Sequence, residues 1–175
     1  QGHIQTTQAS LARVSQTLAQ DAAHVQAGLV ALAQQIEKKA VDLPIHVQVE
    51  PPEDPEELEK LKDAGLDTIG LHIESFDFDI LSKIAPVKAM FGIKRYENAW
   101  KKSVELFGSN QVSTFLIAGL GERRESIIRG SEYLAGMGVF PFLVPFRPIP
   151  GTVLGKKLPP APDLMIGLYE EVSEI

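Results

Sequence analysis

The chain has 175 residues, of which 17 are Lys or Arg and 23 are Asp or Glu, so its formal net charge is −6. This acidic balance argues against nucleic acid as a partner, because no basic block offsets it. Hydrophobic residues make up 44% and charged residues 23%, which excludes intrinsic disorder, and the absence of Cys excludes disulfides, thiolate metal sites and a cysteine nucleophile.

Two features bear on the compartment. No uncharged stretch is long and apolar enough to span a membrane, and Gln1 does not open a basic region followed by an apolar run, as a signal peptide would. The absence of Cys fits a reducing environment. We therefore expect a cytoplasmic protein with no membrane partner.

The first long element that the sequence predicts is a helix over residues 9–40, preceded by a short strand over His3 to Thr7. Its apolar residues recur at steps of three and four. They are Leu11, Val14, Leu18, Ala22, Val25, Leu29, Leu32 and Ile36. This stripe favours a helix that faces the core of its own domain, but the spacing also fits a seam against a partner helix, which would make the chain a homodimer or an assembly module.

From Leu43 onward, short strand-like runs alternate with helical ones. Asp54 and Pro55 predict the start of a helix that ends near Gly65, and Asp163 is expected to cap the last helix. The predicted strands are residues 44–50, 67–74, 111–118 and 140–146. The other predicted helices are residues 78–84, 93–107 and 122–136.

This alternation predicts parallel strands joined by right-handed crossovers. Two strands carry one polar face each: His46, Gln48 and Glu50 in the first, and Thr68, Gly70, His72 and Glu74 in the second. A sheet covered on both faces should be apolar on both, so a polar face favours a (β/α) barrel interior that lines a site. Because five strands are too few to close an eight-stranded barrel, we expect residues 1–175 to form a single partial TIM-like α/β barrel domain.

Polar residues and glycines cluster where these strands end. They are Gln48, Glu50, His72, Glu74, Ser75, Gly119, Gly121, Glu122 and Arg147. Parallel strands bring their carboxyl ends to one rim, which is where such folds bind ligands. Two plainer interpretations stay open: the histidines are core residues satisfied by the backbone, and the Gly-Leu-Gly-Glu segment is only a tight turn.

One motif at this rim resembles a known family. Phe115 to Glu122 (FLIAGLGE) is similar to the fifth-strand motif G-x-I-x-G-x-x-E, which contacts adenine in radical S-adenosylmethionine (SAM) enzymes. Ile117, Gly119 and Glu122 are in register, whereas Phe115 replaces the first glycine. The resemblance implies a six-stranded partial barrel with SAM bound against the end of this strand.

Two more segments follow in the expected order. The strand ending in Glu74-Ser75 matches the fourth-strand position that contacts the ribose or methionine part of SAM. Val144 to Leu154 (VPFRPIPGTVL) resembles the sixth-strand segment P-x-P-G-T-x-L. Over residues 41–175 the sequence most resembles that of the radical SAM proteins encoded beside nitrilases.

The chain also departs from the family pattern. Members hold a [4Fe–4S] cluster through C-x-x-x-C-x-x-C after the first strand, and this chain has no Cys. The second-strand motif Gly-Gly-Glu is not recognisable around Thr6 to Gln8. We therefore expect the second to sixth strands of the barrel without the cluster loop, in either a fragment or a degenerate paralogue.

The resemblance implies that the full-length protein cleaves SAM to a 5′-deoxyadenosyl radical that acts on a small-molecule substrate, whereas this chain alone is inactive. Glu74, Ser75, Ile117, Gly119, Gly121, Glu122 and Arg147 would bind the cofactor, and Gln48, Glu50 and His72 would line the substrate cavity. The alternative enzyme is a metal-dependent barrel hydrolase or lyase that uses His46, Glu50, His72 and Glu74.

Overall fold

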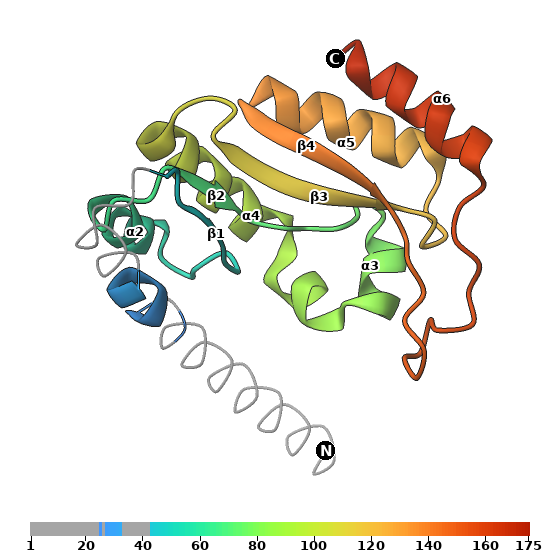
Figure 1. The fold of residues 1–175 in the computed structure, drawn as a ribbon, viewed down its shortest axis with the longest axis horizontal. Helices are drawn as coiled ribbons and strands as arrows, with labels where there is room; N and C mark the ends of the chain where they lie inside the picture. The colour runs from blue at the N-terminus through green and yellow to red at the C-terminus, as the bar shows by residue number, and fades with distance from the viewer. Residues whose placement is uncertain (1–24, 26, 33–42) are drawn as a thin grey trace, which may run out of the picture.

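The computed structural model describes Val25, residues 27–32 and residues 43–175 (Figure 1). The strands are β1 (His46–Gln48), β2 (Thr68–Gly70), β3 (Val112–Ala118) and β4 (Val139–Pro145). The helices are η1 (Pro55–Leu58), α2 (Glu59–Asp63), α3 (Phe78–Ile84), α4 (Pro86–Phe107), α5 (Arg124–Gly136) and α6 (Pro162–Ser173). The strand predicted over His3 to Thr7 lies outside the described residues.

The four described strands form one parallel sheet in the order β1-β2-β3-β4. β3 and β4 pair over seven residues, from Val112 opposite Val139 to Ala118 opposite Pro145. β2 and β3 share only two residue pairs, followed by an isolated bridge between Glu74 and Leu116. The sheet order and the alternation with helices confirm the α/β class and fit the expected partial barrel.

The two faces of the sheet differ in their surroundings. Along β3 the residues alternate between buried and half-buried, and Val112, Leu116 and Ala118 belong to the buried set. Helices α4 and α5 cover this outer face, with α6 packed on α5 (Figure 1). The inner face carries the half-buried side chains of Phe115 and Ile117, so at β3 it is partly open and apolar, and the polar face predicted from the first two strands does not extend across the sheet.

Trp100 and Tyr96 fix α4 against the sheet. Both side chains are completely buried, with ring centroids 5.5 Å apart. The indole N–H of Trp100 donates a hydrogen bond to the Leu71 carbonyl, 3.0 Å away, just beyond β2. A buried polar atom needs such a partner, so this bond determines how α4 lies on the sheet.

Several helix boundaries differ from the prediction. α4 begins at Pro86 rather than residue 93, because Pro86 occupies a first-turn position, and Gly92 interrupts the helix with φ 71°. Asp54 caps η1 as expected, accepting from the Glu56 N–H. The predicted cap at Asp163 is wrong: Pro162 takes the first turn, and Ala161 precedes it without a side-chain bond.

Only part of the predicted long helix is described, and there Val25 and residues 27–32 are helical. Leu29 and Val30 pack against the core, whereas Val25 and Leu32 are 61% and 53% exposed. The predicted stripe is therefore only partly right, since the contacting face includes Val30 and excludes two stripe members. Within the described part of the chain, no helix is long and apolar enough to cross a membrane.

Candidate functional site

Two carboxylates meet at the carboxyl ends of β1 and β2, and a lysine joins them. Lys88 Nζ of α4 lies 2.9 Å from Glu74 Oε1 and 3.3 Å from Glu50 Oε1. It also donates to the His72 carbonyl at 2.7 Å. The rim predicted from sequence therefore brings Glu50 and Glu74 together, through a cation that sequence reasoning missed.

Tyr96 completes this cluster from the same helix. Its hydroxyl donates to Glu50 Oε2 and to the His72 carbonyl, both at 3.4 Å. Burial, together with the negative charges of Glu50 and Glu74, raises the pKa of Tyr96 far above its usual value. The phenol consequently stays protonated and serves as a donor to the carboxylate.

Glu74 has an unusual backbone conformation. Its φ is 73°, in the left-handed region that non-glycine residues rarely adopt. The neighbouring strand holds it there, because Glu74 N–H donates to the Phe115 carbonyl and Ile117 N–H donates to the Glu74 carbonyl, both at 2.9 Å. Such conformations cost about 1–3 kcal/mol and concentrate at functional sites.

His72 faces inward but is partnered within the fold. Its Nδ1 accepts a hydrogen bond from the Phe115 N–H at 3.1 Å, and its ring stacks on Phe115 with centroids 4.0 Å apart. Gly70 leaves room for the ring, since a Cβ there would lie 2.7 Å from His72 Cε1. Because Nδ1 accepts, Nε2 carries the proton, and this atom is buried without a partner. The backbone-satisfied interpretation of His72 therefore holds for Nδ1 and not for Nε2.

The surroundings of His72 make the stability of the fold depend on pH. Burial, then the charge of Lys88, then His46 lower the pKa of His72 to about 4, from an ordinary 6.5. The unfolded chain therefore binds a proton between pH 6.5 and about 4 that the folded chain rejects, so stability falls as the pH is lowered through this window. We expect a loss of about 1–2 kcal/mol after allowing for solvent screening.

Urea unfolding of His72→Asn, measured at pH 7 and pH 4.5, checks this expectation. Asparagine keeps an acceptor near the position of Nδ1 and does not titrate, so the variant should lose less stability on acidification than the parent chain. His46→Asn is the matched control and should retain most of the parent's pH dependence. Equal losses in His72→Asn and the parent would contradict the assignment.

The metal-site alternative is wrong for the residues on which it was based. His46 is exposed and its Nδ1 bonds to Thr68 Oγ1 at 2.7 Å, while Glu50 and Glu74 are occupied by Lys88. His72 is held by Phe115. In the described part of the chain, no group of three or more Asp, Glu or His side chains could hold a metal ion.

The Gly-Leu-Gly-Glu segment forms a closed turn between β3 and α5. Gly119 and Gly121 have φ 100° and 119°, a conformation that requires glycine. Glu122 Oε1 accepts from the Gly119 N–H at 2.7 Å, and its Oε2 is buried without a partner. Helix α5 begins at Arg124, so Glu122 closes the turn and does not start the helix as predicted.

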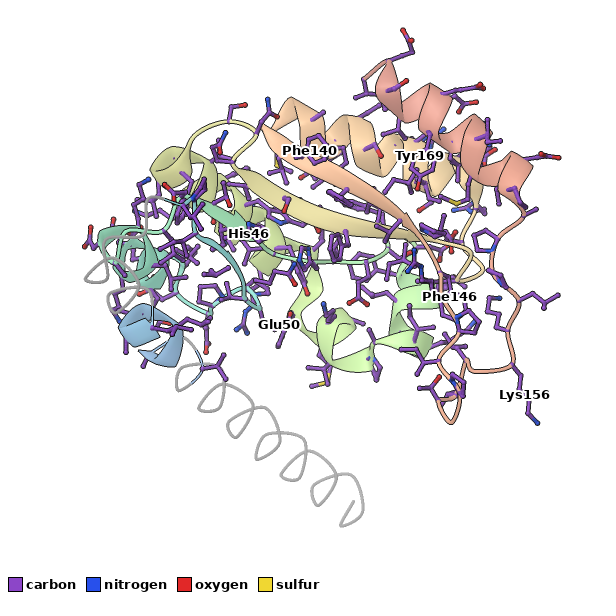
Figure 2. All side chains as sticks on the ribbon, viewed as in Figure 1. His46, Glu50, Phe140, Phe146, Lys156 and Tyr169 are labelled. Atoms are coloured by element: carbon purple, nitrogen blue, oxygen red, sulfur yellow. The ribbon has the colours of Figure 1, made fainter. Side chains whose placement is uncertain are left out.

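The other predicted site residues differ in their availability. Ser75 is buried and its Oγ accepts from the Asp77 N–H at 3.1 Å, which gives it a local turn role. Gln48 and Arg147 are exposed. Figure 2 shows Glu50 and Phe146, which follow β1 and β4, toward one edge of the sheet, and Phe140 toward the other.

Ile117 and Glu74 are the rim residues best placed to meet one ligand. Ile117 is half-buried on the inner face, where β4 places Val144 opposite it. Its N–H bond to the Glu74 carbonyl puts the carboxylate residue on the neighbouring strand. Ile117 and Val144 therefore form an apolar surface, here called the ledge, which lies next to Glu74 at the end of the inner face.

The comparison with family models decides the assignment. The model of the radical SAM superfamily matches residues 17–130. The chain belongs to the radical SAM superfamily. The match spans β1 to β3 and reaches into α5, so it includes the strand that ends in Ile117 and Gly119.

This radical SAM chain is also similar to a curated protein, the bacteriochlorophyllide c C-7(1)-hydroxylase of Chlorobaculum limnaeum. The two are 29% identical over 136 residues, which are 77% of this chain and 34% of the hydroxylase. The chain thus spans about a third of the length of this relative. The narrower likeness to radical proteins encoded beside nitrilases stays a prediction.

Membership implies SAM and a [4Fe–4S] cluster in the full-length protein, and the described residues fit these two groups differently. The cluster needs thiolates, and this chain has none, so its residues do not fit the cluster. The adenosyl part of SAM combines a flat ring with hydroxyl groups, and Ile117 beside Glu74 offers an apolar surface and an acceptor for them.

Proposed function

We propose that this chain forms the SAM-orienting wall of a radical SAM enzyme that acts on a small-molecule substrate. When bound together, SAM and the cluster supply a 5′-deoxyadenosyl radical for hydrogen abstraction. The observation that carries the proposal is the ledge of Ile117 and Val144 beside Glu74 at the carboxyl ends of parallel strands.

The roles of the rim residues follow from their positions. Ile117 packs against the adenine, and Glu74 accepts hydrogen bonds from ribose hydroxyls or the amino group. Gly119, Gly121 and Glu122 act indirectly, because they hold the turn that ends β3.

Arg147 and Ser75 complete the set of residues proposed to act on the cofactor. Arg147 is exposed and makes no ion pair within the described residues, so its guanidinium is available to a carboxylate. Ser75 shapes the backbone after Glu74 through its turn bond.

Lys88 is a positioning residue in this proposal. Its ammonium lies 3.3 Å from Glu50 and 2.9 Å from Glu74, and its own side chain is only 17% exposed. With Lys88 in place, the carboxylate of Glu74 meets the cofactor in one orientation.

The inner face below the rim supports an apolar part of the substrate. Phe115 lies 5.4 Å from Phe142, and Phe142 lies 6.0 Å from Phe140, measured between ring centroids. Phe140 and Phe142 lie on β4, the strand at one edge of the described sheet, and each is 48% exposed. We infer that these rings face a planar, apolar portion of the substrate, with Gln48 and Glu50 on the polar side. This fits the hydroxylase relative, whose name gives a bacteriochlorophyllide as its substrate.

Cofactor binding is tested in the full-length protein that also carries the cluster cysteines. Ile117→Asp places a carboxylate against the adenine, and should weaken SAM binding by tenfold or more, or at least about 1.4 kcal/mol. Glu74→Gln should weaken it less, since an amide oxygen still accepts. Calorimetry measures the affinity, and release of 5′-deoxyadenosine measures the activity.

Ile166→Asp is the matched control, because Ile166 is 54% exposed on α6, away from the inner face. It should leave SAM binding and 5′-deoxyadenosine release at the parent level. If Ile117→Asp folds and binds SAM as tightly as the control, the ledge does not hold the cofactor.

Self-association through the long helix stays a separate prediction, supported by the exposed Val25 and Leu32.

A further inference from the structure

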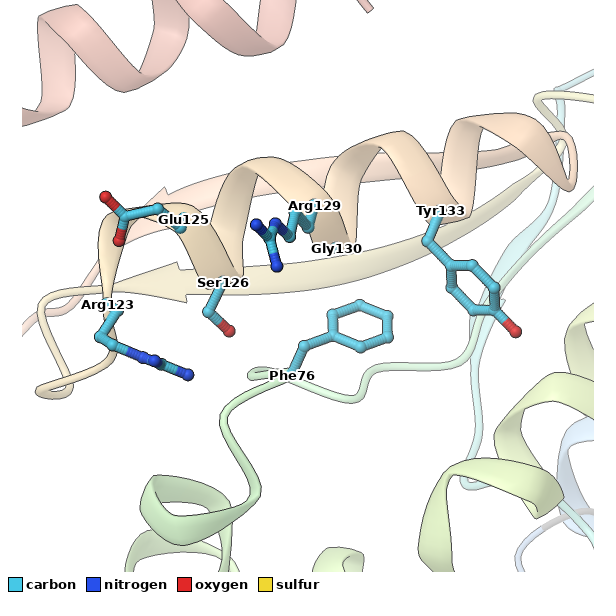
Figure 3. A pocket seen from close by; sticks show the side chains of 7 residues that line it. All are labelled: Phe76, Arg123, Glu125, Ser126, Arg129, Gly130 and Tyr133. Atoms are coloured by element: carbon cyan, nitrogen blue, oxygen red, sulfur yellow. The ribbon is translucent and has the colours of Figure 1, made fainter.

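We propose that a pocket on the outer side of the sheet binds an anionic small molecule that carries a planar ring, with a phosphate or carboxylate as its charged group. The cavity measures about 510 Å³ and lies between helix α5 and Phe76, which follows β2 (Figure 3). Ligand pockets usually enclose about 300–1,000 Å³, so the cavity suits a mononucleotide-sized ligand.

The aromatic side of the pocket is fixed by close packing. Phe76 lies directly on the backbone of α5 at Gly130, where an added Cβ would be 2.5 Å from Phe76 Cδ2. Its ring meets Tyr133 edge-on at 6.0 Å and Trp100 at 6.2 Å. Tyr133 is held in turn, because its hydroxyl donates to Glu97 Oε1 at 2.5 Å. These contacts give a planar ligand a rigid surface.

The charged side of the pocket has two free guanidinium groups. Ser126 and Arg129 are three residues apart on α5 and so lie on one side of the helix, and Arg123 immediately precedes the helix and lines the same pocket. Figure 3 shows these side chains around the space beside Phe76, and the carboxylate of Glu125, which also lines the pocket, points away from Phe76. None of the ion pairs or side-chain hydrogen bonds found among the described residues involves either arginine.

This lack of partners distinguishes the pair from neighbouring arginines. Arg124 donates to the Gly167 carbonyl at 3.1 Å and to Glu171 Oε1 at 2.6 Å. Arg95 donates to the carbonyl groups of Pro51 and Pro52. Arg147 also lacks an ion pair within the described residues, so what sets Arg123 and Arg129 apart is that both line one pocket.

The donor set determines the ligand chemistry. A guanidinium offers a planar fork of N–H groups that matches the oxygens of phosphate or carboxylate, and the Ser126 hydroxyl adds a further donor. The start of α5 adds the positive end of its helix dipole. Phe76 and Tyr133 accept a flat ring, so neither a bare ion nor a neutral ring satisfies the whole pocket.

This pocket is separate from the SAM site proposed above. Helix α5 covers the outer face of the sheet, whereas Ile117 is on the inner face. The two sites can therefore be tested independently with variants on opposite faces.

Titration calorimetry of this chain with AMP, adenosine and inorganic phosphate tests the proposal. AMP should bind at least fivefold more tightly than either fragment. Arg123→Gln and Arg129→Gln should each weaken AMP binding by about fivefold or more. Lys60→Gln removes an exposed cation from α2 and should leave binding unchanged. Both arginines are exposed, so near-ultraviolet circular dichroism should show the parent fold in each variant.

Four results would overturn the proposal. The first is no AMP binding, and the second is AMP affinity unchanged in the Arg123→Gln, Arg129→Gln double variant. The third is AMP binding that is lost in Ile117→Asp but retained in the double variant, because AMP would then occupy the inner rim. The fourth is inorganic phosphate that binds as tightly as AMP, because the planar ring would then contribute nothing to binding.

Discussion

Replacing Trp100 with alanine should lower the free energy of unfolding by about 3–5 kcal/mol. The side chain is completely buried, and its indole N–H satisfies the Leu71 carbonyl. The change therefore leaves a cavity and an unpaired acceptor at the junction of α4 and β2. Urea unfolding followed by far-ultraviolet circular dichroism measures the loss, since the variant has no Trp fluorescence: the chain contains one Trp.

Phe140→Ala is the matched control, because Phe140 is an aromatic residue that is 48% exposed. Its removal should cost less than about 1 kcal/mol, since little of the ring leaves an apolar environment. Trp100→Phe should fall between the two, because it keeps most of the ring but loses the hydrogen bond. Equal losses for Trp100→Ala and Phe140→Ala would contradict the role of Trp100 as the main contact of α4.

Gly119→Ala should lower the free energy of unfolding by about 2–4 kcal/mol. Its φ of 100° is strained for any residue with a Cβ, and that Cβ would lie 2.8 Å from Pro160 Cδ. The bulkier Gly119→Val should be worse, and should also weaken SAM binding in the full-length protein by more than tenfold. Urea unfolding of this chain measures the first effect without any cofactor.

Gly136→Ala makes the same chemical change where nothing lies within 4 Å and φ is not positive. We expect it to be neutral or slightly stabilising, because alanine favours a helix. Pro160→Gly in the Gly119→Ala background should recover part of the loss by removing the clash, while the backbone strain remains. If Gly119→Ala and Gly136→Ala unfold with the same free energy, a Cβ at position 119 causes neither the expected backbone strain nor the clash with Pro160.

The element pattern was largely predictable, because apolar periodicity and turn residues reflect local physics. β3 and β4 fall within a residue of their predicted bounds, and α3 has the bounds predicted for it. The start of α4 was missed because Pro86 opens a helix that Gly92 then interrupts, and sequence spacing reads this as two separate segments. β1 and β2 are shorter than predicted, since apolar alternation continues beyond their ladder bonds.

The site was less predictable than the fold. The strand ends indicated Glu50 and Glu74, but Lys88 and Tyr96 reach them from α4. No spacing in the sequence indicates these contacts, and Tyr96 and Glu50 are 46 residues apart. A lone lysine in the apolar run around Met90 was the available signal. The left-handed backbone of Glu74 could not be predicted from the sequence, because a positive φ is normally expected only at glycine.

Because the strands pair unequally, the two halves of the rim are held by different kinds of bond. β3 and β4 share a continuous ladder of seven residue pairs, whereas β2 is tied to β3 by two pairs and the bridge at Glu74. Between β2 and Glu74, side chains take over part of the pairing, because the Ile73 N–H donates to Thr114 Oγ1 at 2.9 Å and the Phe115 N–H donates to His72 Nδ1 at 3.1 Å. The position of Glu74 therefore depends on side chains of the sheet, whereas Val144 is placed by backbone pairing.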